Sequence, residues 1–235
     1  MITTIPRGSA PSVLLIFLLA TSARGQDRIL TLSDVSPELG RLIGGTPLDF
    51  VAQEEIKYGV TGKPDYDSFY KSSAIAYGGF VVGRGLAEDA TINLKRYARS
   101  KAAVAELQEE IAELTGGADT SDWTVEQSLA VLEAAEKKGQ LSDEERSYLG
   151  KTAAQIAATI PVVESSISAS KDLTEQAPDL VSGARSAFGM RGAAGASRNV
   201  RRSADRIKEI PTEGPKLLES LAVLSKGLAM VAGGS

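Results

Sequence analysis

A long three-four spacing of apolar and small residues dominates residues 65–116 of this chain. The spacing begins at Phe69 and continues to Leu114, so these side chains share one face of an α-helix. Repetition over this length is typical of a helix that packs lengthwise against other helices. Asp65 is a suitable N-cap and Gly116 a suitable stop. We therefore predict one long helix over 65–116.

Small residues fill the first half of this helix face, at Ser72, Ala76, Gly79 and Gly83. Glycine inside a helix costs about 1 kcal/mol relative to alanine, so the glycines need a compensating contact. Close approach of a neighbouring helix to these four residues is the favoured interpretation. A break in the helix and a membrane-active segment over 72–87 are the alternatives. A nucleotide-binding loop does not fit, because the required Lys-Ser/Thr pair and a preceding strand are absent.

Two further helices begin at capping boxes, in which an N-cap hydroxyl and a residue three positions later satisfy each other's backbone N–H groups. The first box starts at Thr124 and predicts a helix that continues to Lys138. The second box starts at Ser142 and predicts a third helix, whose apolar spacing extends to Phe188.

Proline and glycine mark the later part of the chain. Pro161 and Pro178 predict kinks in the third helix, because proline lacks the backbone N–H that a helix interior requires. The Gly-rich segment 188–195 predicts the turn into a fourth helix. Residues 210–215 interrupt that helix before a final one over 217–231.

The N-terminal arm, residues 26–62, is the least regular part of the sequence. Short helices are predicted over 33–43 and 48–58. No stretch has the alternating β-branched pattern that predicts a sheet. The arm is expected to lie along the helices through five apolar side chains: Leu42, Ile43, Leu48, Phe50 and Val51.

Together these patterns predict an all-α protein. Residues 63–235 are expected to form an elongated up-and-down bundle of long, heptad-patterned antiparallel helices, preceded by the short irregular arm. An aromatic content of only 5% suits closely packed helices better than a sandwich or barrel. No internal linker divides the bundle, so we predict a single bundle domain.

Residues 1–25 have the layout of a secretory signal. Arg7 precedes the apolar run 13–20, and small residues before Gln26 mark a cleavage site. The run is shorter than the ~20 residues that span a bilayer, so an uncleaved anchor is the weaker alternative. We therefore predict a periplasmic or extracellular protein that starts near Gln26. The chain has no cysteine, so disulfides and a lipid-modified signal are excluded.

The composition also removes most catalytic chemistry. Without histidine or cysteine, the chain lacks the commonest general base, a thiolate nucleophile and the commonest metal ligands. Acidic residues such as Glu106 and Glu113 fall on outward helix positions, which is typical of a solvated face. We expect neither an enzyme nor a bound cofactor or metal. The net charge of −4 argues against a nucleic-acid partner.

Charge is unevenly distributed along the chain. Residues 106–145 are strongly acidic, whereas 188–208, which we call the basic segment, holds five arginines: Arg191, Arg198, Arg201, Arg202 and Arg206. Ion pairing between these two regions of the same molecule is the favoured interpretation. The alternative is contact with an anionic surface, to which Phe188 and Met190 would add apolar atoms.

Two classes of function follow from the sequence. The first is an exported helical-bundle protein that acts as a structural or interaction module, with a protein or an envelope component as its partner. The second is a membrane-active protein that uses residues 72–87 or 188–208 on anionic lipid. The aromatic cluster over 66–80 is expected to form core and not a ligand platform.

Overall fold

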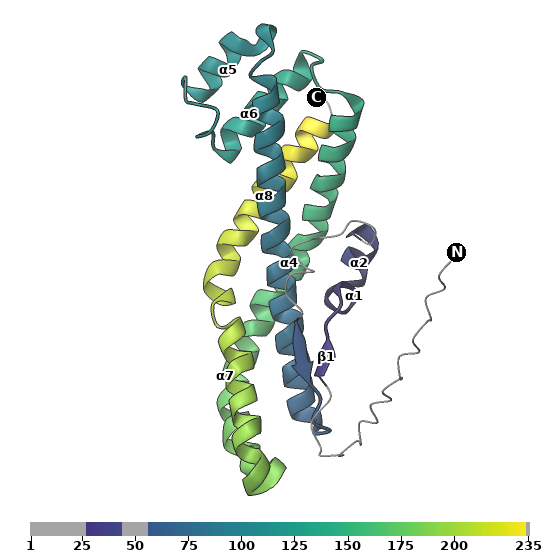
Figure 1. The fold of residues 1–235 in the computed structure, drawn as a ribbon, viewed down its shortest axis with the longest axis vertical. Helices are drawn as coiled ribbons and strands as arrows, with labels where there is room; N and C mark the ends of the chain where they lie inside the picture. The colour runs from purple at the N-terminus through teal and green to yellow at the C-terminus, as the bar shows by residue number, and fades with distance from the viewer. Residues whose placement is uncertain (1–26, 44–55, 234–235) are drawn as a thin grey trace, which may run out of the picture.

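The computed structural model describes residues 27–43 and 56–233 of the chain (Figure 1). The predicted signal, its cleavage site at Gln26 and most of the second arm helix lie outside these residues. Most of the described residues are helical, and the strands are short. The prediction of an all-α protein with a helical-bundle fold is therefore confirmed at this level.

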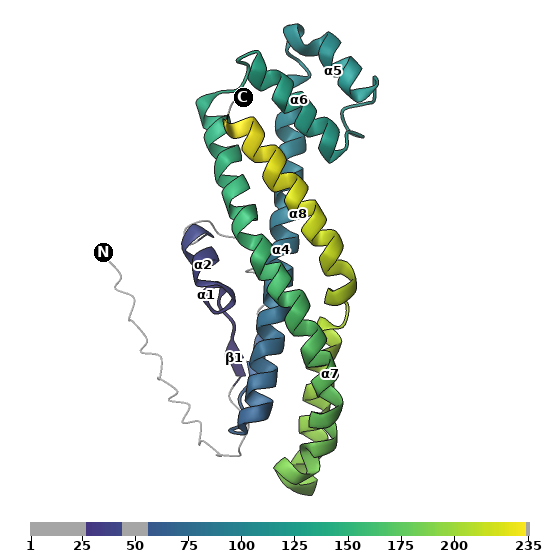
Figure 2. The same ribbon diagram turned by 180° about the vertical axis from the view of Figure 1, so that it is seen from behind.

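Three long helices form the body of the molecule. They are α4 (Pro64–Lys101), α7 (Asp143–Ile207) and α8 (Ile210–Gly233). Both views show them side by side along the long axis of an elongated molecule (Figures 1 and 2). The shorter α6 (Val125–Lys137) covers one end of this group.

The helix predicted over 65–116 is wrong in its second half, because α4 ends at Lys101. Val104 has an extended backbone (φ −80°, ψ 113°), and the chain continues through a 3₁₀ turn, η1 (Ala105–Leu107), into α5 (Gln108–Thr115). The turn places α5 beside α6, where Leu107 and Ile111 are buried in the same core as Trp123. The three-four spacing continues across the turn because these side chains are buried on both sides of it.

The glycine-rich part of α4 is helical throughout, so the predicted alternative of a helix break is wrong. Gly78, Gly79, Gly83 and Gly85 are all buried. A Cβ added at Gly78 would lie 2.8 Å from Leu30 Cδ2 of the arm. The glycine face therefore contacts neighbouring elements and does not face solvent.

Both capping boxes are present as predicted. Thr124 Oγ1 accepts the Gln127 backbone N–H at 3.2 Å at the start of α6. Ser142 Oγ accepts the Glu145 backbone N–H at 3.2 Å at the start of α7. These boxes succeed as sequence signals because their contacts are local and need no tertiary partner.

The predicted Gly-rich turn is much shorter than 188–195. Helical geometry is lost only at Gly189 (φ 67°, ψ 179°), where the chain turns back on itself. Neither Pro161 nor Pro178 interrupts helical geometry. The predicted interruption at 210–215 is displaced: α7 ends at Ile207, and 210–215 form the first turns of α8. Pro211 is tolerated there because the first N–H groups of a helix have no helical partner, whereas Pro215 lies inside the helix.

The arm contains two short helices, α1 (Leu32–Val35) and α2 (Pro37–Ile43), and one side of a small sheet. Strand β1 (Asp27–Ile29) pairs antiparallel with β2 (Lys57–Gly59). The expectation of no sheet is wrong, and so is the helix predicted through residue 58. These strands have three residues each and gain their stability from packing on α4, which no periodicity reports.

The contacts of the arm also differ from those predicted. Leu42 is 45% exposed, so its predicted contact is wrong; the other four predicted side chains lie outside the description. Leu39 makes the contact instead: it is 0% exposed and packs against Val82 and Leu86 of α4.

Two large cores occupy the two ends of the molecule. One surrounds Trp123 and joins α4, α5, α6, the first part of α7 and the C-terminal part of α8. The other surrounds Tyr66 and Tyr70 and joins α4 to both parts of α7 near the Gly189 turn. The aromatic residues near the start of α4 therefore belong to the core, as predicted.

Candidate functional site

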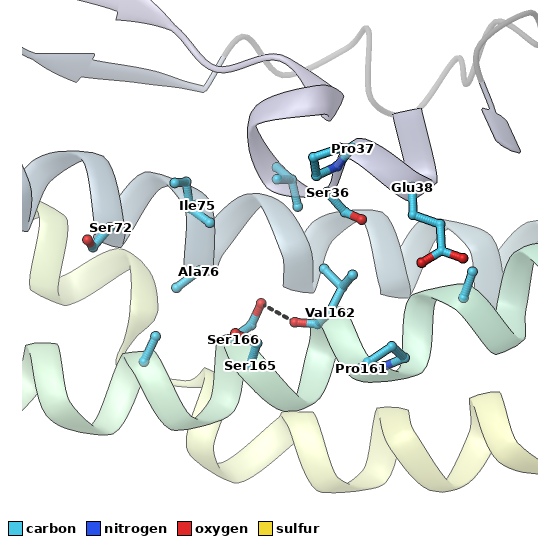
Figure 3. Close-up of a pocket in the computed structure, with 13 residues that line it drawn as sticks. Ser36, Pro37, Glu38, Ser72, Ile75, Ala76, Pro161, Val162, Ser165 and Ser166 are labelled. Atoms are coloured by element: carbon cyan, nitrogen blue, oxygen red, sulfur yellow. Dashed lines mark hydrogen bonds between the residues drawn. The ribbon is translucent and has the colours of Figure 1, made fainter. Parts of the chain in front are cut away.

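A groove lies where the arm, α4 and α7 meet (Figure 3). Its volume is about 440 Å³. On the α4 side it is bordered by Ser72 and Ala76, two of the predicted close-packing residues. Ser36, Pro37 and Glu38 approach from the arm, and the remaining wall comes from Pro161, Val162, Ser165, Ser166 and other α7 residues.

Small side chains keep this groove open. Ala76 is 1% exposed, and its single methyl group leaves space between α4 and α7. Ser72 also borders a second cavity of about 450 Å³ farther along the same two helices, which Asp65 and Asp172 line. The groove therefore follows the junction of α4 and α7.

The groove is lined mainly by serine hydroxyls and by small or apolar side chains. Ser166 Oγ donates to Val162 O at 2.8 Å, so this hydroxyl is engaged within its own helix. Glu38 is exposed and is the one charged residue along the wall of the 440 Å³ cavity. A serine nucleophile requires a neighbouring general base, and the chain has no histidine to supply one.

Gly79 and Gly83 follow Ser72 and Ala76 on α4 and face α7 directly. A Cβ at Gly79 would overlap Ser166 Oγ, and a Cβ at Gly83 would overlap Val163 Cγ2. The four residues predicted for close packing are thus brought to one junction. Ser72 and Ala76 line its open part, and the two glycines occupy its tight part.

All five predicted arginines of the basic segment are exposed, on the part of α7 that follows Gly189. Intervals of seven, four and four residues separate Arg191, Arg198, Arg202 and Arg206, so these four share one helix face. Arg201 neighbours Arg198 at a spacing of three residues, but it lines a surface hollow with Pro178 and Asp205 that none of the other four arginines lines. The structure therefore divides the predicted cluster into a row of four, here called the arginine row, and Arg201.

The acidic residues expected to pair with these arginines lie at the other end of the molecule, on α5, α6 and the start of α7 (Figure 1). They have nearer partners, as in the ion pairs Lys138–Glu110 and Lys101–Glu145 at 2.8 Å each. Across residues 27–43 and 56–233, no ion pair joins the basic segment to 106–145. The favoured interpretation of internal pairing is therefore wrong.

The apolar residues at the Gly189 turn have separate environments. The Phe188 ring contacts the Tyr66 ring edge-on, with centroids 4.7 Å apart, and is half-buried. Met190 is 77% exposed. Met190 is therefore the more exposed of the two apolar side chains at this turn.

Tyr70 and Glu145 are among the groups whose pKa values are shifted by their surroundings. Burial, followed by the nearby Tyr66 and Asp67, raises the pKa of Tyr70 to about 12, so its hydroxyl stays protonated and donates to Ala196 O at 3.2 Å. Burial opposes ionisation of Glu145, but hydrogen bonds from Lys101 and Ser142 outweigh it, and the pKa of Glu145 is lowered. Both groups stabilise the fold. Glu145 lies away from the arginine row, whereas Tyr70 borders a pocket that Arg202 and Arg206 also line.

Sequence reasoning missed the residues that the arm and the middle of α7 bring to the groove. These residues belong to no motif. The arm supplies Ser36 and Glu38, and α7 supplies Ser165 and Ser166, more than a hundred positions later in the chain. Their proximity depends on how α2 packs against α7. No sequence signal could have found them.

Three further findings bear on function. Within the described ranges, no group of three or more acidic residues is placed to hold a metal ion. None of the described helices is both long and apolar enough to cross a membrane. Comparison with known protein families, with characterised proteins and with solved structures produced no match.

Proposed function

We propose that this chain is an exported helical-bundle interaction module that presents the arginine row to an anionic component of the cell envelope. The observation that carries the proposal is the exposure of Arg191, Arg198, Arg202 and Arg206 on one helix face, remote from the acidic end. The secretory layout of residues 1–25 supports the location.

Electrostatics explains why such a row favours a partner. Like charges on one face repel one another, and a polyanion lowers that energy. Guanidinium groups also suit this role because each offers a planar set of donors that matches carboxylate and phosphate oxygens. Contacts of this kind weaken as salt increases, because the Debye length is about 10 Å at 0.1 M and shrinks at higher concentration.

The proposal includes the finer architecture predicted from the sequence, an antiparallel bundle with heptad packing. The chain reversal at Gly189 supports it, as does Ser197 Oγ, which donates to Val181 O across the turn at 3.4 Å. A rod of this kind holds the arginine row at a fixed distance from the acidic end.

A second candidate function is contact with anionic lipid, and the exposed side chain of Met190 favours it. Met190 and Arg191 together would allow shallow insertion of the turn beside lipid phosphates. Residues 72–87 do not favour this function, because their glycines pack against α7 and the arm.

The experiment compares two doubly charge-reversed proteins. Arg198→Glu with Arg202→Glu should abolish salt-sensitive binding to anionic envelope fractions, with unchanged thermal unfolding because both side chains are exposed. Lys151→Glu with Lys226→Glu makes the same change in net charge at the other end and should bind like the unaltered protein. Equal loss in both variants would mean that net charge alone governs binding, and the proposal would fail.

Anionic vesicles separate the second candidate from the first. Salt-sensitive vesicle binding that Met190→Ser weakens would support lipid contact. Binding to envelope fractions with no binding to vesicles would leave the interaction module as the function.

A further inference from the structure

An unusual polar stripe runs along α7 after the Gly189 turn. Asn199, Arg202, Ser203 and Arg206 stand at spacings of three, four and seven residues, which place them on one side of a helix. A helix that packs against another element normally carries apolar residues at these spacings. The core contact of this helix is made beside the stripe, by Val200 and Ile207, each 0% exposed.

The stripe faces the arm sheet and α4 across a pocket of about 220 Å³. Strand β2 supplies one wall, α4 supplies Tyr70 and β1 supplies Asp27. The lining is almost entirely polar: Asp27, Lys57, Tyr58, Gly59, Tyr70, Asn199, Arg202, Ser203 and Arg206. Three segments distant in sequence therefore combine to form it.

The charge of this pocket is positive. Arg202 and Arg206 contribute two guanidinium groups, and Asp27 is the one carboxylate among the lining residues. Arg206 is also held at the wall, since its Nη1 donates to Lys57 O at 3.5 Å. Arg202 lies one helical turn before Arg206, so the two residues are neighbours on the same helix face. Two guanidinium groups thus border one small volume.

Hydrogen-bond donors surround this volume as well. Asn199 and Ser203 line the α7 side and Tyr58 lines the β2 side, and each of these side chains carries a hydrogen-bond donor. A carboxylate has two oxygens and is satisfied by a single bidentate arginine. A tetrahedral anion with three or four oxygens uses donors from several directions, which is what this lining provides.

We propose that this pocket binds a phosphate group, with Arg202 and Arg206 as its principal ligands. A phosphate carries a charge of about −1.5 to −2 at neutral pH, so it attracts the two guanidinium groups of Arg202 and Arg206. The pocket is also larger than phosphate alone, so the molecule that carries the group has room at the open side. This inference rests on the proposed function, because it names the anionic group that the arginine row recognises.

Arg202 and Arg206 line the pocket, whereas the neighbouring Arg201 on the same helix does not. Arg201 is exposed, has the same charge and lies within one residue of Arg202, but it lines a different hollow. Arg201→Gln is therefore a matched control for Arg202→Gln and Arg206→Gln.

The test is calorimetric titration of the full protein with inorganic phosphate, against chloride at equal ionic strength. Phosphate should bind saturably at one site. Arg202→Gln or Arg206→Gln should raise the dissociation constant about tenfold, since one charge-assisted hydrogen bond is lost. Arg201→Gln should leave the constant unchanged. Thermal unfolding of each variant, expected to be unaltered, excludes loss of the fold as the cause.

Two results would contradict the assignment of a phosphate site to this pocket. The first is the absence of saturable phosphate binding, and the second is equal weakening of phosphate binding by Arg201→Gln and Arg202→Gln. Neither result would affect the proposed function if envelope binding persists and still depends on Arg198 and Arg202. Conversely, phosphate binding without envelope binding would support the pocket and contradict the proposed function.

Vesicles containing phosphatidylglycerol distinguish the two sources of phosphate. If inorganic phosphate displaces the protein from these vesicles, and Arg202→Gln weakens vesicle binding while Arg201→Gln does not, a lipid headgroup occupies the pocket. If phosphate binds and the vesicles do not, a soluble phosphate compound does.

Discussion

At the scale of single residues, Lys101 shows how one buried charge joins distant parts of the chain. Its Nζ donates to Gln140 O at 2.9 Å and to Glu145 Oε1 at 2.8 Å, where α4 ends and α7 begins. The two side chains are only 10% and 18% exposed. Buried pairs of this kind are strongly destabilising to break, because the remaining charge is left without compensation.

Acid should weaken this ion pair in a defined direction. The pKa of Glu145 is lowered in the folded protein, so its stabilising contribution is complete above the ordinary pKa of a glutamate and is lost as pH falls through the lowered value. Glu145→Gln should cost about 3 kcal/mol at pH 7 and much less at pH 3. Urea unfolding of both proteins at the two pH values measures this. A constant difference between them would contradict the prediction.

A second residue-scale prediction concerns the tight junction of α4 and α7. Gly79→Leu or Gly83→Leu should reduce the free energy of unfolding by about 1–3 kcal/mol, because each side chain would overlap Ser166 or Val163. Gly195→Leu is the matched control, since Gly195 is an exposed helical residue with nothing near its Cβ position. If all three variants melt alike, the junction is not closely packed.

At the scale of secondary-structure elements, turns determine where the helices end and which neighbours they pack against. The three-four spacing predicted one helix over 65–116, yet the chain turns after Lys101 and places α5 on α6. A single glycine at position 189 likewise converts one long helical segment into two that lie side by side.

Gly189 should therefore tolerate no side chain without cost. Its backbone (φ 67°, ψ 179°) belongs to a region that is essentially restricted to glycine, where other residues cost about 1–3 kcal/mol. Gly189→Ala should lower the free energy of unfolding by that amount, whereas Gly195→Ala, in a regular helix, should be neutral or stabilising. Chemical denaturation measures both. A neutral Gly189→Ala would mean that the turn has another geometry.

At the scale of the whole molecule, the helices form an elongated body with a core near each end and opposite charge at the two ends (Figure 1). The acidic end carries its own ion pairs, whereas the arginine row is exposed. This separation is what makes an external anionic partner the better explanation for the row.

The elongated shape has a direct test in solution scattering. A compact globule of about 210 residues would have a radius of gyration of about 17 Å. The protein without residues 1–25 should exceed this value clearly, because its long helices lie along one axis. A radius close to that of the compact globule would show that the helices fold over one another in solution.

The sequence by itself determined the helical class, both capping boxes and the core role of the aromatic residues. It also determined that one face of α4 carries small side chains. Each of these depends on contacts within one helix or on the side-chain spacing along it. Tertiary structure alone decided the end of α4 at Lys101, the β1–β2 pair and the pocket that Arg202 and Arg206 share with that pair and α4. Those features depend on residues that are far apart in the chain, and a periodic pattern does not change when a helix turns and packs on a different neighbour.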